Sequence, residues 1–170
     1  SLRHEGSSKF GQNHKWGNFP AVSVGWRLSD EPFMAWASSW LNDLKFRYDY
    51  GVTGNQDFGS YNSLATYRAF GYYQYNGTSF HVWGPSKNVN TELRWEKGHN
   101  QNIGVDFSVL NHRISGSLNY FIRRQSDLLG DYNVPVPPHL FTTIFTNVGT
   151  LRNSGFEFDI NVDAIRKDNF

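Results

Sequence analysis

Strict alternation of apolar and polar residues is the feature that most constrains what this chain can fold into. It runs through five segments, at 21–28, 44–52, 103–109, 114–122 and 156–164. Of the 23 positions on the first face of these segments 22 are apolar, whereas only Ala21 and Phe121 are clearly apolar among the 19 positions on the opposite face. A helix has a period of 3.6 residues and does not produce this pattern. The alternation therefore predicts β-strands that each have one apolar and one polar face.

Six main strands are expected, and the connections between them differ in length. Residues 110–113 form a tight turn, 6–18 a medium connection, and 53–93 and 125–154 long ones. Residues 29–43 are expected to hold a short capped helix that starts at Asp30-Glu31-Pro32, with proline in its first turn. The main strands are placed at 1–5, 19–28, 43–53, 94–110, 113–125 and 155–166, with a weaker strand at 67–75 inside the longest connection.

Two architectures alternate in this way, a soluble β-sandwich and a transmembrane β-barrel. Three features favour the barrel. The strands at 94–110 and 113–125 exceed the ~9–11 residues with which a tilted strand crosses a bilayer. The polar face mixes small residues with acids, as a water-filled lumen requires. Aromatic residues lie near the expected strand ends and suit an interfacial girdle: Trp16, Phe19, Trp26, Trp40, Trp95 and Tyr120.

In the barrel interpretation the short turns face the periplasm and the long connections face outward, so 53–93 is expected to be a long extracellular loop. The fold class is then all-β, an antiparallel transmembrane barrel segment of about six long strands. Such a segment has two open edges, and we expect that it does not fold alone as a soluble monomer. The chain begins within a strand and is interpreted as an internal piece of a longer protein. Residues 166–169 are expected to turn into another strand, and Phe170 is not interpreted as a barrel-ending signal.

Composition argues against several kinds of chemistry. The absence of cysteine excludes disulfides, thiolate metal sites and cysteine nucleophiles, and a net charge of +1 gives no indication of nucleic-acid binding. The six histidines are scattered without ligand spacing, and no P-loop, G-x-S-x-G or H-E-x-x-H motif is present. The sequence therefore predicts neither an enzyme nor a metal or cofactor site.

Candidate binding residues form three groups, one in the long extracellular loop, one on the lumen-facing side of the strands and one at the outer rim. Ligand or partner contact is predicted for an aromatic cluster in the long extracellular loop, formed by Tyr72, Tyr73, Tyr75 and Trp83, because aromatic side chains supply rigid amphipathic surface. A lumen-facing position, in contact with a plug or solute, is predicted for Arg47, Asp49, Asp106, Glu157 and Asp159. Arg123 and Arg124 are expected at the outer rim, where they could meet phosphates of the outer-membrane lipid.

Seven stretches together resemble the C-terminal half of the barrel in SusC/RagA-type TonB-linked outer-membrane proteins of Bacteroidetes-like bacteria. They occur in the family's order and cover most of the chain, with 61–90 matching least. The stretches are 3–11 (RHEGSSKFG), 16–28 (WGNFPAVSVGWRL), 40–56 (WLNDLKFRYDYGVTGNQ), 93–97 (LRWEK), 102–107 (NIGVDF), 113–120 (RISGSLNY) and 147–157 (NVGTLRNSGFE).

This resemblance implies a barrel of about 22 strands with an N-terminal plug that is absent from this chain. It implies active import of oligosaccharides or peptides across the outer membrane, energised by a TonB complex, with a SusD-like surface lipoprotein over the barrel. Three alternatives stay open at this point. They are an iron-chelate or cobalamin receptor of the wider TonB-dependent class, a passive pore, and a soluble β-sandwich that binds carbohydrate.

Overall fold

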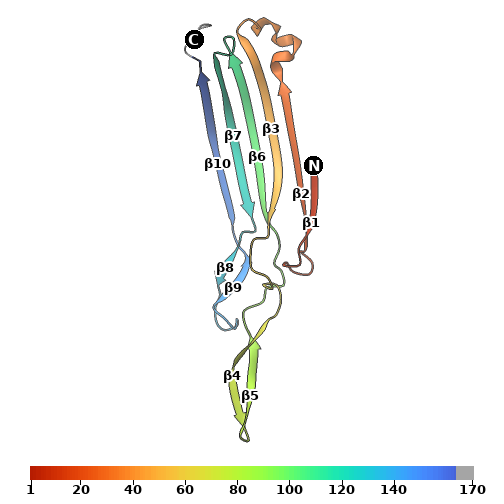
Figure 1. Cartoon of the computed structure of the whole chain (residues 1–170), viewed down its shortest axis with the longest axis vertical. Helices are drawn as coiled ribbons and strands as arrows, with labels where there is room; N and C mark the ends of the chain where they lie inside the picture. Colours follow the sequence, from red (N-terminus) through yellow and green to blue (C-terminus); the bar gives the residue numbers. More distant parts are fainter. Residues whose placement is uncertain (164–170) are drawn as a thin grey trace, which may run out of the picture.

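The computed structural model describes residues 1–163 and shows one long, curved antiparallel sheet (Figure 1). Its six strands lie in the order β1-β2-β3-β6-β7-β10, and each pairs with its neighbour in antiparallel fashion. The strands are β1 (Leu2–Gly6), β2 (Trp16–Arg27), β3 (Leu41–Asn55), β6 (Glu96–Val109), β7 (Ile114–Ser126) and β10 (Thr150–Val162). All six predicted main strands are therefore present, and the all-β prediction is confirmed.

The differences concern boundaries. β2 begins three residues before the predicted strand, and β10 begins at Thr150 rather than at residue 155. β10 is longer because Thr150 and Leu151 continue the register with Ser126 and Gln125 of β7. The expected end of this strand at residue 166, the turn at 166–169 and Phe170 lie outside the described residues.

The end of the sheet with short connections carries the 110–113 turn and two 3₁₀ helices, η1 (Leu28–Asp30) and η2 (Pro32–Ala37). Proline does occupy the first turn of η2, as predicted. The predicted capping is wrong, because neither helix has a side-chain hydrogen bond at its N-cap. Leu110, Asn111 and His112 all have positive φ, which lets the chain reverse between β6 and β7 in so few residues.

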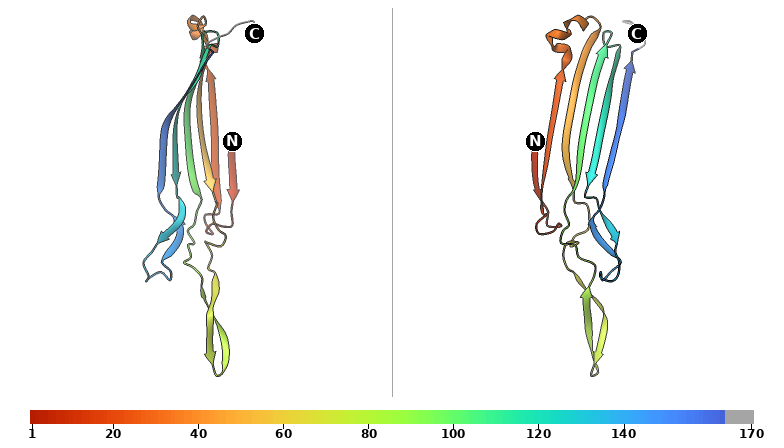
Figure 2. Two further views of the ribbon diagram at one scale, coloured as in Figure 1. Left: turned by 60° about the vertical axis from the view of Figure 1, so that its left-hand side comes forward. Right: turned by 180° about the vertical axis from the view of Figure 1, so that it is seen from behind.

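The opposite end carries two hairpins, neither of which was predicted as a pair of strands (Figure 2). β4 (Tyr67–Tyr75) is the expected weak strand, and it pairs with β5 (Thr78–Pro85), which was missed. A second hairpin, β8 (Leu129–Asn133) with β9 (Thr143–Asn147), occupies the 125–154 connection. Figure 1 shows the β4–β5 hairpin projecting far beyond the end of the sheet.

A small hydrophobic core joins the long connections where they leave the sheet. It comprises Phe10, Phe19, Val52, Leu93 and Trp95. The Trp95 ring lies 4.7 Å from that of Phe10 and 5.2 Å from that of Phe19, and its indole N–H donates to the Lys15 carbonyl at 3.0 Å. Phe19 and Trp95 are each 3% exposed. Their predicted place in an interfacial girdle is therefore wrong, because they pack against loop residues instead.

The apolar face of the sheet has no second layer over it within the described residues. Cross-strand register places Tyr48, Ile103, Tyr120 and Phe156 in one row, and Phe46, Val105, Leu118 and Phe158 in the next. Phe156 is 76% exposed and Phe158 63%, although in a sandwich such residues would be sealed. The sandwich interpretation is therefore wrong, and β1 and β10 leave both edges of the sheet open. No helix in residues 1–163 has the length and apolar character needed to span a membrane.

Candidate functional site

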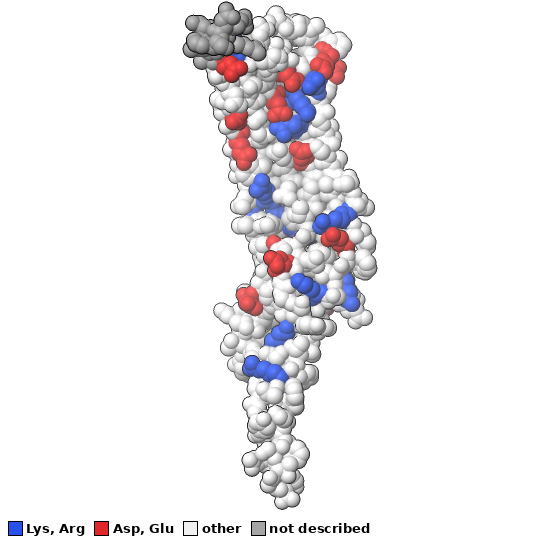
Figure 3. All heavy atoms as spheres, viewed as in Figure 1, with Lys and Arg blue, Asp and Glu red and all other residues white. Residues whose placement is uncertain are grey.

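The five residues predicted to face the lumen all lie on the polar face of the sheet. Register places Asp49 opposite Asn102, Asp106 opposite Ser117, and Glu157 opposite Asn119. Arg47 lies opposite Gly104, and Asp159 is opposite Ser117 on the other side of β7. Charged side chains of both signs spread over the sheet in Figure 3. The polar face is therefore a largely hydrophilic surface across the four strands β3, β6, β7 and β10.

Arg47 links three strands through one network. Its Nη2 donates to Asp106 Oδ1 at 2.7 Å and to Asn119 Oδ1 at 3.0 Å, and its Nε lies 2.7 Å from Asp106 Oδ2 without meeting hydrogen-bond geometry. Gly104 makes this possible, because a Cβ there would lie 2.5 Å from Asn119 Oδ1 and 3.0 Å from Arg47 Nη2. The charge of Arg47 is thus balanced inside the sheet.

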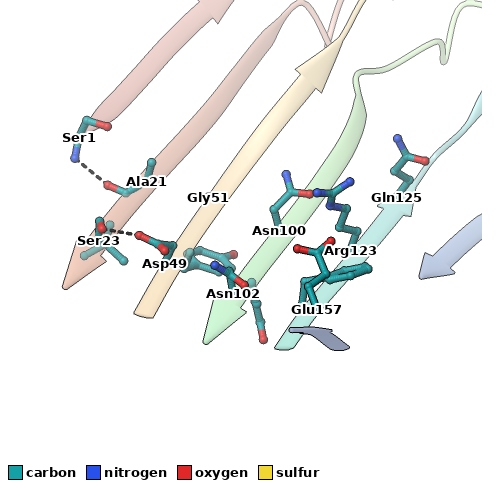
Figure 4. A pocket seen from close by; sticks show the side chains of 14 residues that line it. Ser1, Ala21, Ser23, Asp49, Gly51, Asn100, Asn102, Arg123, Gln125 and Glu157 are labelled. Carbon is teal, nitrogen blue, oxygen red and sulfur yellow. Dashed lines mark hydrogen bonds between the residues drawn. The ribbon is translucent and has the colours of Figure 1, made fainter. Parts of the chain in front are cut away.

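A shallow groove on this face lies closer to the loop end (Figure 4). Most of the side chains that line it are polar or charged, among them Asp49, Asn100, Asn102, Arg123, Gln125 and Glu157. Ser23 hydroxyl donates to Asp49 at one margin. Amide side chains both donate and accept hydrogen bonds, so the groove suits hydroxyl groups or peptide units rather than an isolated ion. Residues 1–163 hold no cluster of three or more side chains that could bind a metal.

Asn100, Asn102 and Gln125 were not among the predicted site residues, although continuing the alternation of β6 and β7 places them on the polar face. Arg123 and Arg124 were predicted together at the outer rim. They are neighbours in a strand, so they point to opposite faces. Arg123 lies near the loop-side end of β7 but lines the polar groove, with its guanidinium 5.2 Å from the Phe121 ring centroid, so its predicted contact with lipid phosphates is wrong.

The four predicted loop aromatics are exposed on the β4–β5 hairpin, but they form two groups rather than one. Tyr73 and Tyr75 stack with ring centroids 6.5 Å apart. Tyr72 lies opposite His81, 4.3 Å between ring centroids, and His81 in turn lies 6.5 Å from Trp83. Each of the four is at least 59% exposed. The hairpin therefore offers two separate aromatic surfaces.

Comparison with known proteins places these features in a family. The family described as "TonB dependent receptor-like, beta-barrel" matches residues 1–168. TonB-dependent receptor P39 of Formosa agariphila is 39% identical over 172 residues, and TonB-dependent receptor SusC of Bacteroides thetaiotaomicron is 34% identical over 174. All of this chain is covered in both cases, but it spans only 16% and 17% of those relatives.

Solved structures show a similar relationship, to a SusC/RagA-type transporter. The RagAB peptide importer in its open-open state matches with a TM-score of 0.86 and 27% identity, over 99% of this chain and 18% of that one. In the closed-closed state the TM-score is 0.82 over 98% of this chain. The sheet described above is thus an unclosed part of an outer-membrane barrel. The chain belongs to the TonB-dependent receptor β-barrel family and is a segment of a SusC/RagA-type protein.

Proposed function

We propose that the complete protein imports oligosaccharides or peptides across the outer membrane with energy supplied through TonB. Relatives that carry the names SusC and RagAB peptide importer support this proposal. The observation in the chain that carries it is the pairing of one largely polar face with a long aromatic hairpin at its loop end. In this proposal the polar face lines the lumen and contacts solute or plug, and the chain carries out no covalent chemistry.

The β4–β5 hairpin would act outside the membrane, as part of the 53–93 extracellular loop. Beyond Arg68 it carries no charged residue, and its exposed rings are of the kind that stack on sugars or pack in protein interfaces. A surface lipoprotein of the SusD type is the proposed partner at this end. Because the rings form two groups, one surface is free to contact the lipoprotein while the other contacts substrate.

Uptake measurements test the proposal in a strain whose chromosomal copy is replaced by variants of the full-length gene. Tyr73→Ser with Tyr75→Ser alters one aromatic surface, and Tyr72→Ser with Trp83→Ser alters the other. We expect each double variant to reach the outer membrane at the wild-type level. One should lose co-purification of the lipoprotein, and the other should lose uptake while keeping the lipoprotein.

Deletion of the gene gives the decisive comparison. Growth on defined oligosaccharides and on peptide mixtures should fail for one of these two nutrient classes and be restored by the wild-type gene. Deletion of TonB function should give the same defect. Normal growth of the deletion strain on every oligosaccharide and peptide source would contradict import.

A further inference from the structure

The apolar face of the sheet ends in a row of basic residues on the loop side. Alternation places His99, Arg124 and Arg152 on the same face as Ile103, Tyr120 and Phe156. Register places these three basic residues side by side on β6, β7 and β10. In the next row, Ser126 of β7 lies between Lys97 of β6 and Thr150 of β10. The face thus changes along β6, β7 and β10 from apolar and aromatic residues, through a row of Gln101, Ile122 and Ser154, to basic residues.

The position of the basic row fits the outer boundary of the hydrocarbon. Val109, near the short-turn end of β6, and His99 are ten residues apart, and a strand rises about 3.4 Å per residue. The distance along the strand is therefore about 34 Å, and a tilt of about 40° reduces it to about 26 Å across the membrane. Barrels of this kind have an apolar band about 25 Å tall. The row lies where the headgroups of the outer leaflet begin.

The basic row is not neutralised by the chain itself. Arg124 and Arg152 face each other directly across β7 and β10, and like charges in such pairs destabilise a sheet. Neither residue has a carboxylate partner among residues 1–163. A shallow groove runs over them, and it is lined also by Tyr50, His99, Ser126 and Thr150 without any acidic residue. Tyr50 hydroxyl and His99 Nδ1 are 3.2 Å apart within this lining.

We infer that this groove binds a phosphate of the lipopolysaccharide in the outer leaflet. Two guanidinium groups at the headgroup level match a phosphate by charge and by their paired N–H groups. The hydroxyls of Ser126 and Thr150 add neutral donors beside them. The bound anion removes the repulsion between Arg124 and Arg152, so lipid binding stabilises the β7–β10 pairing. Transport itself is not required for this interaction.

The test uses the full-length protein extracted from its own outer membrane with mild detergent. Phosphorylated lipid A that co-purifies is quantified by mass spectrometry for the wild type, for Arg124→Gln with Arg152→Gln, and for Arg123→Gln. We expect a loss of about tenfold or more in the double variant, because each lost charge-assisted bond weakens binding about tenfold. Arg123→Gln, next in sequence but on the polar face, should retain the wild-type amount.

A second measurement needs only the wild-type protein. Delipidated protein is mixed with lipid A or with enzymatically dephosphorylated lipid A, and its unfolding temperature is recorded. Only the phosphorylated form should raise it. The inference is wrong if both forms act alike, if Arg124→Gln with Arg152→Gln keeps its lipid, or if Arg123→Gln loses lipid to the same extent.

Discussion

Charged side chains are arranged differently on the two faces of the sheet. On the polar face, Arg47 is held by Asp106 and Asn119, and its neighbours are amides and acids. On the apolar face, Arg124 and Arg152 lie on the loop side of the apolar rows and face each other without an acid between them. The same six strands carry both faces. This difference supports the proposal that the polar face contacts water inside the barrel and the apolar face contacts lipid outside it.

This contrast explains why the chain has so small a core of its own. Among the described residues the buried hydrophobic side chains number seven, and most of them join the loops at one end of the sheet. Across the membrane-spanning rows the apolar side chains are exposed or only half-buried in the isolated chain. Their burial comes from lipid, while the backbone bonds along β1 and β10 must be completed by other strands of the barrel.

The largest expected effect follows from that dependence. The 170-residue chain on its own, in buffer without detergent, should aggregate and show no cooperative thermal transition, because its apolar face and both sheet edges are open. Circular dichroism and sedimentation measure this directly. A sharp unfolding transition of a soluble monomer would contradict the assignment of the apolar face to lipid.

A smaller effect is expected from arginine substitutions at two adjacent positions that lie on opposite faces of the sheet. Leu118 lies in the middle of the apolar rows and Ser117 beside Asp106 and Asp159 on the polar face. In the full-length protein folded into vesicles, Leu118→Arg should lower the unfolding free energy by about 2–4 kcal/mol, since the bilayer midplane excludes a charge. Ser117→Arg should cost little, because water and two carboxylates are near. Equal costs at the two positions would show that the faces do not differ in their surroundings.

The main sheet could be predicted from sequence because its signal is local and repeated. Residues such as Phe156 and Glu157 alternate without interruption, and each strand provides its own pattern. Of the β4–β5 hairpin only β4 was predicted, and the failure to predict β5 has a physical reason. It faces water on both sides, so residues such as Phe80 and His81 have no single buried face to produce alternation. The available signal was Asn76-Gly77, which has positive φ at both positions, as a two-residue hairpin turn requires.

The candidate sites show the same limit. Alternation was enough to place Asp49 and Glu157 on one face, but the Arg47 network depends on Gly104 leaving room between strands that are far apart in sequence. The basic row likewise joins His99, Arg124 and Arg152 through register, and register between β6, β7 and β10 is not visible in any one strand. The register between paired strands was therefore the information that the sequence alone did not provide.

The polar face can be tested through its glycines. Gly104→Ala should destabilise the full-length protein by about 1–3 kcal/mol, as overpacking does, because the new methyl group overlaps the Arg47–Asn119 contact. Gly51→Ala is the matched control on the same face, since its Cβ would lie at an ordinary 3.8 Å from Ala21 Cβ. Urea unfolding in vesicles measures both. A neutral Gly104→Ala would mean that Arg47 and Asn119 separate without cost.

The smallest expected effect concerns the short-turn end of the apolar face, where Trp26 combines a lipid-facing ring with a polar contact. Its indole N–H donates to Glu31 Oε1 at 2.8 Å, and the ring is 48% exposed. Trp26→Phe keeps an aromatic ring at the interface but removes this bond, so we expect a loss of about 0.5–1.5 kcal/mol. Trp83→Phe on the outer hairpin, whose indole has no hydrogen bond among the described residues, should change the unfolding free energy by less.

A second substitution separates the hydrogen bond of Trp26 from the size of its ring. Glu31→Ala removes the acceptor, and the cost of Trp26→Phe is then measured again in that background by urea unfolding in vesicles. If the bond to the carboxylate accounts for the loss, Trp26→Phe should become nearly neutral once Glu31 is replaced. A cost that persists unchanged would mean that the larger indole ring in the headgroup region provides the stabilisation, and the contact with Glu31 would then contribute nothing measurable.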